Sequence, residues 1–305
     1  MAIKAKFAAL GAFALLTALT ACDAVGIKKV THEEGLRLET PLLSRGNQLV
    51  DGQSAHPAKS YEEVHAFYER LGISTREALK GKAFKPTGLL SQVPKDFANI
   101  QTVDQKKEAF LAFTLLPIKA VNASLLEERA DLLAIHRKYG DQGPYPAQIQ
   151  DKLDHFANRF GGKANVADLL KRVDIIPPSL ALSQAAIESG WGTSRFAIQG
   201  NALFGEHTTS KELGLDAEHA RHVSVEAFDT VYDSVASYMM NLNSHAAYAD
   251  LREIRANLRA KGQTISGQRL AVALTPYSER KQAYVTEVRS VISHNNLALL
   301  DVKQG

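Results

Sequence analysis

The stretch "LSQAAIESGWG", residues 182–192, is a helix pattern that stops at a charged residue and a glycine turn. Up to Ile187 it offers almost no polar face, and a helix that is apolar nearly all round is buried. Glu188 stands at the end of this helix, and Gly190 and Gly192 flank the only tryptophan of the chain. The pattern predicts a buried helix that delivers one carboxyl group to a turn with little side-chain bulk.

A carboxyl group in that position favours its protonated form. Burial makes the charged form costly, and the C-terminal end of a helix carries partial negative charge. Both effects raise the pKa of the Glu188 carboxyl, and a group that holds its proton near neutral pH can act as a general acid. The alternative, from position alone, is an ordinary capping or salt-bridged glutamate at a helix end.

The sequence on either side predicts a mainly helical body. Pro177 and Pro178 suit the first turn of the helix that ends at Glu188. Downstream, Asp233 is predicted to cap another helix. Upstream, apolar periodicity and capping residues predict helices at 60–70, 105–116 after Asp104, 123–139 after Asn122, 146–160 and 166–173, with Pro117 ending or kinking the second.

One region breaks the helical pattern. Residues 211–231 lack a helical period and alternate at Val223, Val225 and Ala227, which predicts a short β-hairpin. This region and its approach are rich in acidic residues: Glu206, Glu212, Asp216, Glu218, Glu226 and Asp229.

The run "SLALSQAAIESGWGTSRFAIQGNALFG", residues 179–205, resembles the bacterial glucosaminidases of glycoside hydrolase family 73. Their pattern is an apolar helix, then Gln-Ala-Ala-x-Glu-Ser-Gly-Trp-Gly, a serine, and Asn-x-Leu-Phe-Gly. Within that family the chain is most similar to the Bax-type proteins. This resemblance extends through 173–197, 233–259 and 277–285.

The resemblance implies an α+β fold that is predominantly α: a lysozyme-like helical body with a small β-lobe beside a sugar-binding cleft. It places this domain at residues 93–300. The implied activity is that of an endo-β-N-acetylglucosaminidase, which hydrolyses β-1,4 bonds that follow N-acetylglucosamine in peptidoglycan. Two other functions stay open. One is a lytic transglycosylase on the same fold, and the other is a non-catalytic glycan-binding envelope lipoprotein.

The family also implies roles for particular residues. Glu188 matches the general acid, and glycoside hydrolysis generally needs a second carboxyl group. Glu218 fits that position best and Glu226 is second, although this stretch departs from the family wording Thr-x-Glu-Tyr. Tyr277 matches a family tyrosine at the catalytic centre, where a phenol could hold water or stabilise developing charge. Without the resemblance, Tyr277 would be a packing residue before a helix capped by Ser278.

Further residues are expected to contact the substrate. Trp191 could stack on a sugar ring, with a place in the core as the alternative. Tyr238 lies on a predicted packing face and could also reach the cleft. The full set of expected contacts is Ser189, Trp191, Asn201, Phe204 and Tyr238. The family's usual glycine after Ser-Glu-Arg is replaced by Lys281, which could alter that turn.

The N-terminus reads as a targeting segment. Residues 1–21 combine Lys4 and Lys6 with an apolar run too short to span a bilayer, as in a signal peptide. The run ends in Leu-Thr-Ala followed by Cys22, the only cysteine, which resembles a lipoprotein lipobox. We therefore predict lipidation of Cys22, a tether and N-terminal helical segment at 22–92, and attachment to a membrane facing the periplasm. Asp23 favours the inner membrane. The alternative is an ordinary secretory signal.

Composition excludes several other classes. The net charge of +3 would fall by two, to +1, on loss of Lys4 and Lys6, so there is no electrostatic case for nucleic acid. The histidines are scattered, without His-Glu-x-x-His or a cysteine partner, and predict no metal site. No cofactor is expected. The predicted partners are peptidoglycan and a membrane, and oligomeric state is not predicted.

Overall fold

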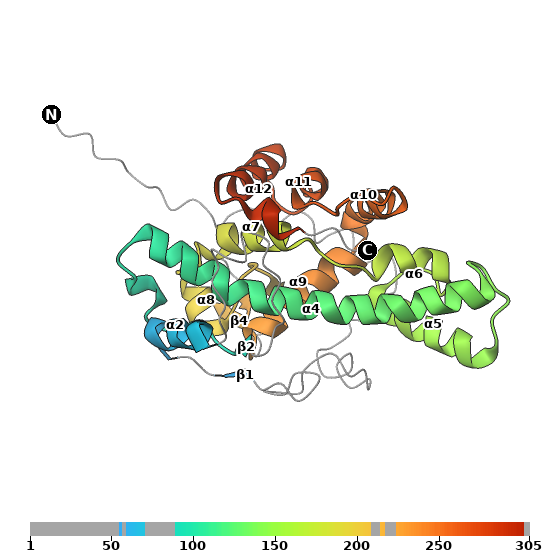
Figure 1. Ribbon diagram of the computed structural model, residues 1–305, viewed down its shortest axis with the longest axis horizontal. Helices are drawn as coiled ribbons and strands as arrows, with labels where there is room; N and C mark the ends of the chain where they lie inside the picture. The colour runs from blue at the N-terminus through green and yellow to red at the C-terminus, as the bar shows by residue number, and fades with distance from the viewer. Residues whose placement is uncertain (1–54, 57–58, 71–88, 209–213, 217–223, 302–305) are drawn as a thin grey trace.

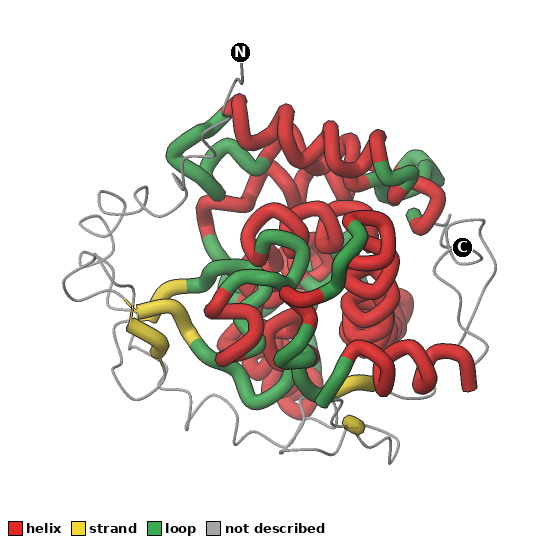
Figure 2. The backbone as a smooth tube through the Cα atoms, turned by 90° about the vertical axis from the view of Figure 1, so that its left-hand side faces the viewer, coloured by secondary structure: helices red, strands yellow, loops and turns green. Residues whose placement is uncertain are grey.

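The computed structural model describes residues 55–56, 59–70, 89–208, 214–216 and 224–301. It is a helical body with a small three-stranded sheet at one edge (Figures 1 and 2). The predicted α+β fold class, predominantly α, is confirmed. The helices are α2 Tyr61–Arg70, α4 Val103–Tyr139, α5 Ala147–Phe160, α6 Val166–Arg172, α7 Pro178–Ser189, α8 Arg195–Gly200, α9 Val231–Ser244, α10 Ala249–Ala260, α11 Gly267–Leu270 and α12 Gln282–His294. The 3-10 turns are η3 Phe97–Asn99, η4 Ala246–Tyr248, η5 Ala271–Ala273 and η6 Leu297–Leu300.

The long helix α4 replaces the two shorter helices expected from the sequence. It runs without a break through Pro117, because residues 109–118 are all buried against the rest of the body. It also begins two residues earlier than expected, because Thr102 rather than Asp104 is its N-cap and accepts a hydrogen bond from the Gln105 N–H. Figure 1 shows α4 along the longest axis of the molecule, with α5 and α6 at one end.

Asn122 does not cap a helix because its side chain has other partners. Its amide nitrogen donates to the Ile176 carbonyl at 2.8 Å, and its amide oxygen accepts from the Ile176 N–H at 3.0 Å. Asn122 thereby joins α4 to the segment that leads into α7. In the described part of the chain, α4 alone is long and apolar enough to cross a membrane, yet 72% of its apolar window is buried inside the protein.

The central helix α7 is held at both ends. Residues 178–186 are all buried, as the apolar pattern predicted. At its start, the N–H groups of Ser179 and Gly267 donate to the two oxygens of Asp301 at 3.0 and 2.9 Å. Gly267 has to be glycine there, since a side chain would collide with Ser179 and with the Leu180 backbone. The start of α11 therefore packs directly on the start of α7.

The small sheet contains the predicted hairpin and one further strand. Its order is β3 (His207–Thr208), β5 (Ser224–Glu226) and β4 (Gly214–Asp216), with both pairs antiparallel. Val225 is opposite His207 on one side and Leu215 on the other. Glu218 lies outside the described residues. A second, two-stranded parallel pair joins β1 (Ala55–His56) to β2 (Leu89–Leu90).

Two caps refine the expected boundaries. Helix α9 begins at Val231, because Thr230 is its N-cap and Asp233 is the reciprocal partner three residues on, completing a capping box. Near the C-terminus, the Ser278 hydroxyl accepts from the Arg280 N–H at 3.3 Å, and α12 begins only at Gln282. Asp233 and Ser278 therefore help to shape these starts without being the N-caps.

Candidate active site

The carboxyl group of Glu188 is placed by a tight turn after α7. Gly190 adopts the left-handed conformation at the end of the helix, with φ of 58°. The Ser189 hydroxyl donates to the Ala185 carbonyl at 2.6 Å and accepts from the Gly192 N–H at 2.8 Å. Ser189 is fully buried, so in this geometry it fixes the turn and presents no group to a substrate.

Trp191 packs toward α4. Its ring meets Phe110 edge-on, with centroids 5.7 Å apart, and the Lys107 ammonium lies 4.9 Å from its centroid. Gly192, with φ of 78°, sits against the Phe110 and Phe97 rings, where a side-chain carbon would be 3.0 Å from Phe110. The glycine is thus needed for close approach to α4. Trp191 therefore packs against the core, which was the alternative expected from the sequence, and it is only partly buried.

The segment "NALFG", residues 201–205, brings a second turn to Glu188. Asn201 follows the last residue of α8 and adopts the left-handed backbone conformation. Its side chain accepts a hydrogen bond from the Val93 N–H at 3.0 Å and donates one to the Phe228 carbonyl at 2.9 Å. Asn201 therefore ties three segments together and is itself buried. At the end of the turn, a side-chain carbon on Gly205 would lie 3.7 Å from Oε2 of Glu188. Glycine keeps this side of the carboxyl group unobstructed.

Tyrosine rings surround Glu188 on its other sides. The Tyr284 side chain of α12 lies close enough to Glu188 for each group to shift the pKa of the other. The Tyr277 ring stacks on Tyr284 with centroids 5.5 Å apart, and its hydroxyl donates to the Phe204 carbonyl at 3.1 Å. Phe204 in turn stacks on Tyr238, with centroids 3.9 Å apart and the rings 7° from parallel. Tyr277, Phe204 and Tyr238 are therefore brought together around the predicted acid.

The environment of Glu188 favours its protonated form. Burial is the main cause and raises the pKa of its carboxyl group, with a smaller upward contribution from Glu287. The Tyr284 side chain and the positive charge of Arg280 act in the opposite direction. Burial outweighs them, so the pKa of Glu188 lies above its ordinary value. The arrangement can hold a proton and offer it on the side of Gly205.

Glu206 is a second unusual acid that the sequence did not single out. Its Oε2 atom is buried and has no hydrogen-bond partner among the described residues. Burial raises the pKa of Glu206 to about 8, with Glu226 adding to the increase and a hydrogen bond from Ser237 opposing it. The one signal in the sequence that could have pointed to Glu206 is its position directly after Gly205. Its proximity to Ser237 on α9 could not be predicted from the sequence.

Glu206 should make stability depend on pH. Because its folded-state pKa of about 8 exceeds the ordinary 4.5, its stabilising contribution is present below pH 4.5 and is lost as pH rises through 8. Glu206→Gln should therefore be more stable than wild type by up to about 4 kcal/mol at pH 8.5, relative to their difference at pH 4.5. Urea unfolding at the two pH values measures this, with exposed Glu279→Gln as control. Parallel pH dependence in wild type and Glu206→Gln would contradict it.

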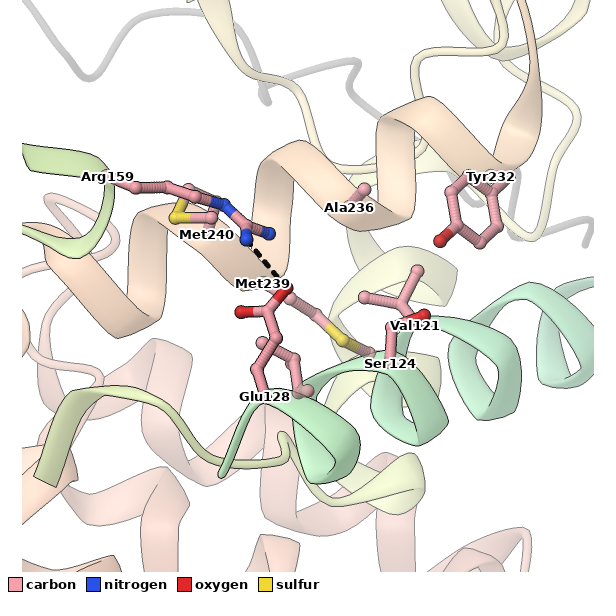
Figure 3. A pocket seen from close by; sticks show the side chains of 9 residues that line it. Val121, Ser124, Glu128, Arg159, Tyr232, Ala236, Met239 and Met240 are labelled. Atoms are coloured by element: carbon pink, nitrogen blue, oxygen red, sulfur yellow. Dashed lines mark hydrogen bonds and ion pairs between the residues drawn. The ribbon is translucent and has the colours of Figure 1, made fainter. Parts of the chain in front are cut away.

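A cavity elsewhere in the body is too small to be a glycan site. It lies between α4, α5 and α9, where Arg159 pairs with Glu128 at 2.6 Å (Figure 3). Its volume of about 20 Å³ suits roughly one water molecule. Tyr232 and Met239 line it from one face of α9, whereas Tyr238 on the same helix points to Gln184. The described residues contain no group of three or more His, Cys, Asp or Glu suited to a metal ion.

The structure brings Glu188, Phe204, Tyr238 and Tyr277 into one site. Ser189 and Asn201 lie beside it as buried supports of its two turns. Glu226 lies close to Glu206, next to this site, and its negative charge raises the pKa of Glu206. The predicted residues Glu218 and Cys22 both fall outside the described residues.

Comparison with known proteins gives three similarities. Residues 163–297 match the glucosaminidase family model, described as mannosyl-glycoprotein endo-β-N-acetylglucosaminidase. The chain is 33% identical to the protein Bax of Escherichia coli strain K12 over 186 residues, which cover 59% of this chain and 66% of Bax. A solved structure, the catalytic domain of the autolysin Auto from Listeria monocytogenes, shows 16% identity and a TM-score of 0.32, covering 57% of this chain and 96% of that one. The family match contains both turns and every tyrosine of the candidate site.

Proposed function

The chain carries a glucosaminidase-family domain of the Bax type, and from this premise we propose that it is an endo-β-N-acetylglucosaminidase that hydrolyses the glycan strand of peptidoglycan. The observation that supports a catalytic role most directly is the carboxyl group of Glu188. It is partly buried, favours its protonated form and faces a glycine turn that leaves its Oε2 side open. These are the properties of a general acid for a bulky leaving group.

In the proposed reaction, Glu188 donates its proton to the glycosidic oxygen as the bond to the N-acetylglucosamine carbon breaks. A second carboxyl group activates water or stabilises the oxocarbenium-like transition state. We propose Glu218 for that role, with Glu226 as the alternative, and Tyr277 as an assistant that orients water or stabilises charge. Kinetics of Glu218→Gln, Glu226→Gln and Tyr277→Phe, each checked for folding, would rank the three.

Digestion of purified peptidoglycan tests the proposal. Hydrolysis should release fragments with N-acetylglucosamine at the reducing end, identified by mass and by reduction with borohydride. Products that end in an internal anhydro ring would instead identify a lytic transglycosylase, in which intramolecular attack replaces water. Retention on peptidoglycan without any released fragment would identify the third possibility, a non-catalytic glycan-binding protein.

We also propose that the protein is a lipoprotein anchored by Cys22 to a membrane that faces the periplasm, with Asp23 favouring the inner membrane. The support is the position of the only cysteine directly after an apolar segment. Labelled fatty acid should enter the wild-type protein, and Cys22→Ser should release it from membranes. A single acyl chain binds a membrane only marginally, so stable anchoring requires several chains. A mature N-terminus well beyond Cys22, without lipid, would contradict the anchor.

A further inference from the structure

Gln184 and Glu188 stand four residues apart on α7, so their side chains share one face of the helix. Gln184 is fully buried and both ends of its amide are engaged. The Tyr238 hydroxyl of α9 donates to its Oε1 at 2.7 Å. Its Nε2 donates to the Tyr284 hydroxyl of α12 at 3.0 Å. Three helices are thus joined by one line of hydrogen bonds that ends beside Glu188.

Counting donors gives this line a direction. A tyrosine hydroxyl has one proton, and Tyr238 gives its proton to the Gln184 carbonyl oxygen. That bond leaves the Gln184 nitrogen to face Tyr284, whose oxygen accepts from it. The single proton of Tyr284 then remains for a further acceptor, and the neighbouring carboxyl group is that of Glu188, whose pKa Tyr284 lowers. The hydrogen bonds from Tyr238 to Gln184 and from Gln184 to Tyr284 therefore run in one direction, toward Glu188.

Among the described residues that act on Glu188, Tyr284 is the neutral side chain with a proton to donate. Arg280 and Glu287 act on Glu188 from the α12 side by charge. Tyr277, Tyr248 and Tyr238 lie within electrostatic reach. They are neutral at working pH, because burial raises the pKa of each phenol, to about 12 for Tyr248. From the opposite turn, Gly205 faces the Oε2 atom and has no side chain to donate.

We propose that Tyr238, Gln184 and Tyr284 form a one-way hydrogen-bond relay that positions the Glu188 carboxyl group. The Tyr284 hydroxyl holds one carboxyl oxygen as an acceptor, which leaves the other oxygen to carry the transferable proton toward the Gly205 turn. Tyr284 is a positioning residue, since it acts through Glu188. This role rests on the proposed function in one respect, that Glu188 is the general acid.

Tyr284→Phe tests the relay through the pH profile. The lost bond favours charged Glu188, so its removal raises the pKa of Glu188. The alkaline limb of kcat/KM on soluble glycan strands should therefore move to higher pH. Turnover at the optimum should fall by about 10- to 100-fold, because the carboxyl group loses its fixed orientation.

A direct titration provides the readout that does not need turnover. The full-length protein in detergent, labelled with carboxyl-¹³C glutamate, shows the Glu188 signal as the one missing from Glu188→Gln. Its midpoint should move upward in Tyr284→Phe. A downward shift would show that Glu188 donates to Tyr284 and that the relay runs the other way. An unchanged midpoint would show that Tyr284 donates nothing to Glu188. Either result overturns the proposal.

Two further variants separate the relay from loss of packing. Tyr238→Phe frees the Gln184 amide to turn and divert the Tyr284 proton, so the midpoint should move in the same direction by a smaller amount. Tyr248→Phe removes a neighbouring phenol that is outside the relay, and the Glu188 midpoint should stay where it is. An upward shift in Tyr248→Phe equal to that in Tyr284→Phe would overturn the relay in favour of a general effect of lost polarity.

Failure of the relay and failure of the proposed function give different results. If Glu188→Gln remains active, Glu188 is not the general acid, whatever the titration shows. If Glu188→Gln is inactive while the Glu188 midpoint is unmoved in Tyr284→Phe, the function stands and the relay is wrong.

Discussion

Glu188→Gln should lower peptidoglycan turnover by about 100-fold or more, on the scale of general acid catalysis. Glutamine keeps the size of the side chain and can still accept a hydrogen bond from Tyr284, but it has no proton to transfer. Stability should hold or rise, because a carboxyl group that burial disfavours is removed. The rate of product release and the urea midpoint, measured on the same preparation, check both statements.

The matched control for this variant is Glu287→Gln. Glu287 acts electrostatically on Glu188 but lies on the surface, 42% exposed and paired with Arg280 at 2.6 Å. Its replacement removes a negative charge close to Glu188 without touching the proposed acid, so turnover should change by less than about tenfold. A fully active Glu188→Gln protein would remove the catalytic assignment. An equal loss in both variants would mean that local charge, rather than proton transfer, matters.

The sequence predicted the core of this site because its signals there are local. An apolar helix, two glycines and one carboxyl group within residues 182–192 were enough to place Glu188 at a buried helix end. The family wording then drew attention to Asn201 and Phe204. It did not indicate what Asn201 holds, since its partner Val93 is 108 residues away in the chain.

What could not be predicted depends on such distant contacts. Gln184 receives its hydrogen bond from a tyrosine 54 residues away and donates to another 100 residues away. The single helix α4 was missed for a related reason. Pro117 is locally a helix breaker, but burial of the whole turn around it against other helices outweighs that preference.

Asp174→Asn should destabilise the fold by about 3–5 kcal/mol, because it leaves buried positive charges without their counter-ion. The Asp174 side chain is only 2% exposed. Arg259 donates hydrogen bonds to both carboxylate oxygens of Asp174 at 2.5 Å. The Arg129 Nη1 atom lies 3.5 Å from the Oδ2 atom of Asp174. Arg255, fully buried, has its Nε atom 3.9 Å from the same carboxylate. Asparagine fits the space but neutralises none of these guanidinium groups.

The arginines cannot simply move out to solvent, because they also hold backbone carbonyls. Arg255 donates to the Lys171 and Ile175 carbonyls, each at 2.8 Å. Arg129 donates to the Val173 carbonyl at 3.1 Å. These carbonyls lie at the end of α6 and in the segment that leads into α7. Loss of the charge at Asp174 should therefore loosen the entry to the helix that carries Glu188.

Acid should reproduce part of this effect in the wild type. Burial raises the pKa of Asp174, but the hydrogen bond from Arg259 and the charges of Arg255 and Arg129 outweigh it and hold the pKa below its ordinary value. A depressed folded-state pKa gives stability that is present above about pH 4 and is lost as pH falls through the folded pKa. Asp174→Asn should lack this acid-dependent loss and be unstable at every pH.

Urea unfolding of Asp174→Asn at pH 7 and pH 3, beside Asp131→Asn, measures these effects. Asp131 pairs with Lys152 at 2.7 Å, but the two side chains are 57% and 44% exposed. An exposed pair contributes less than about 1 kcal/mol, so Asp131→Asn should unfold almost as wild type does. If both variants lose equally little free energy of unfolding, the backbone carbonyls alone are enough to stabilise the buried arginines, and Asp174 does not contribute to stability. If only Asp174→Asn collapses, the carboxylate before α7 holds the cluster together, and the position of Glu188 depends on it.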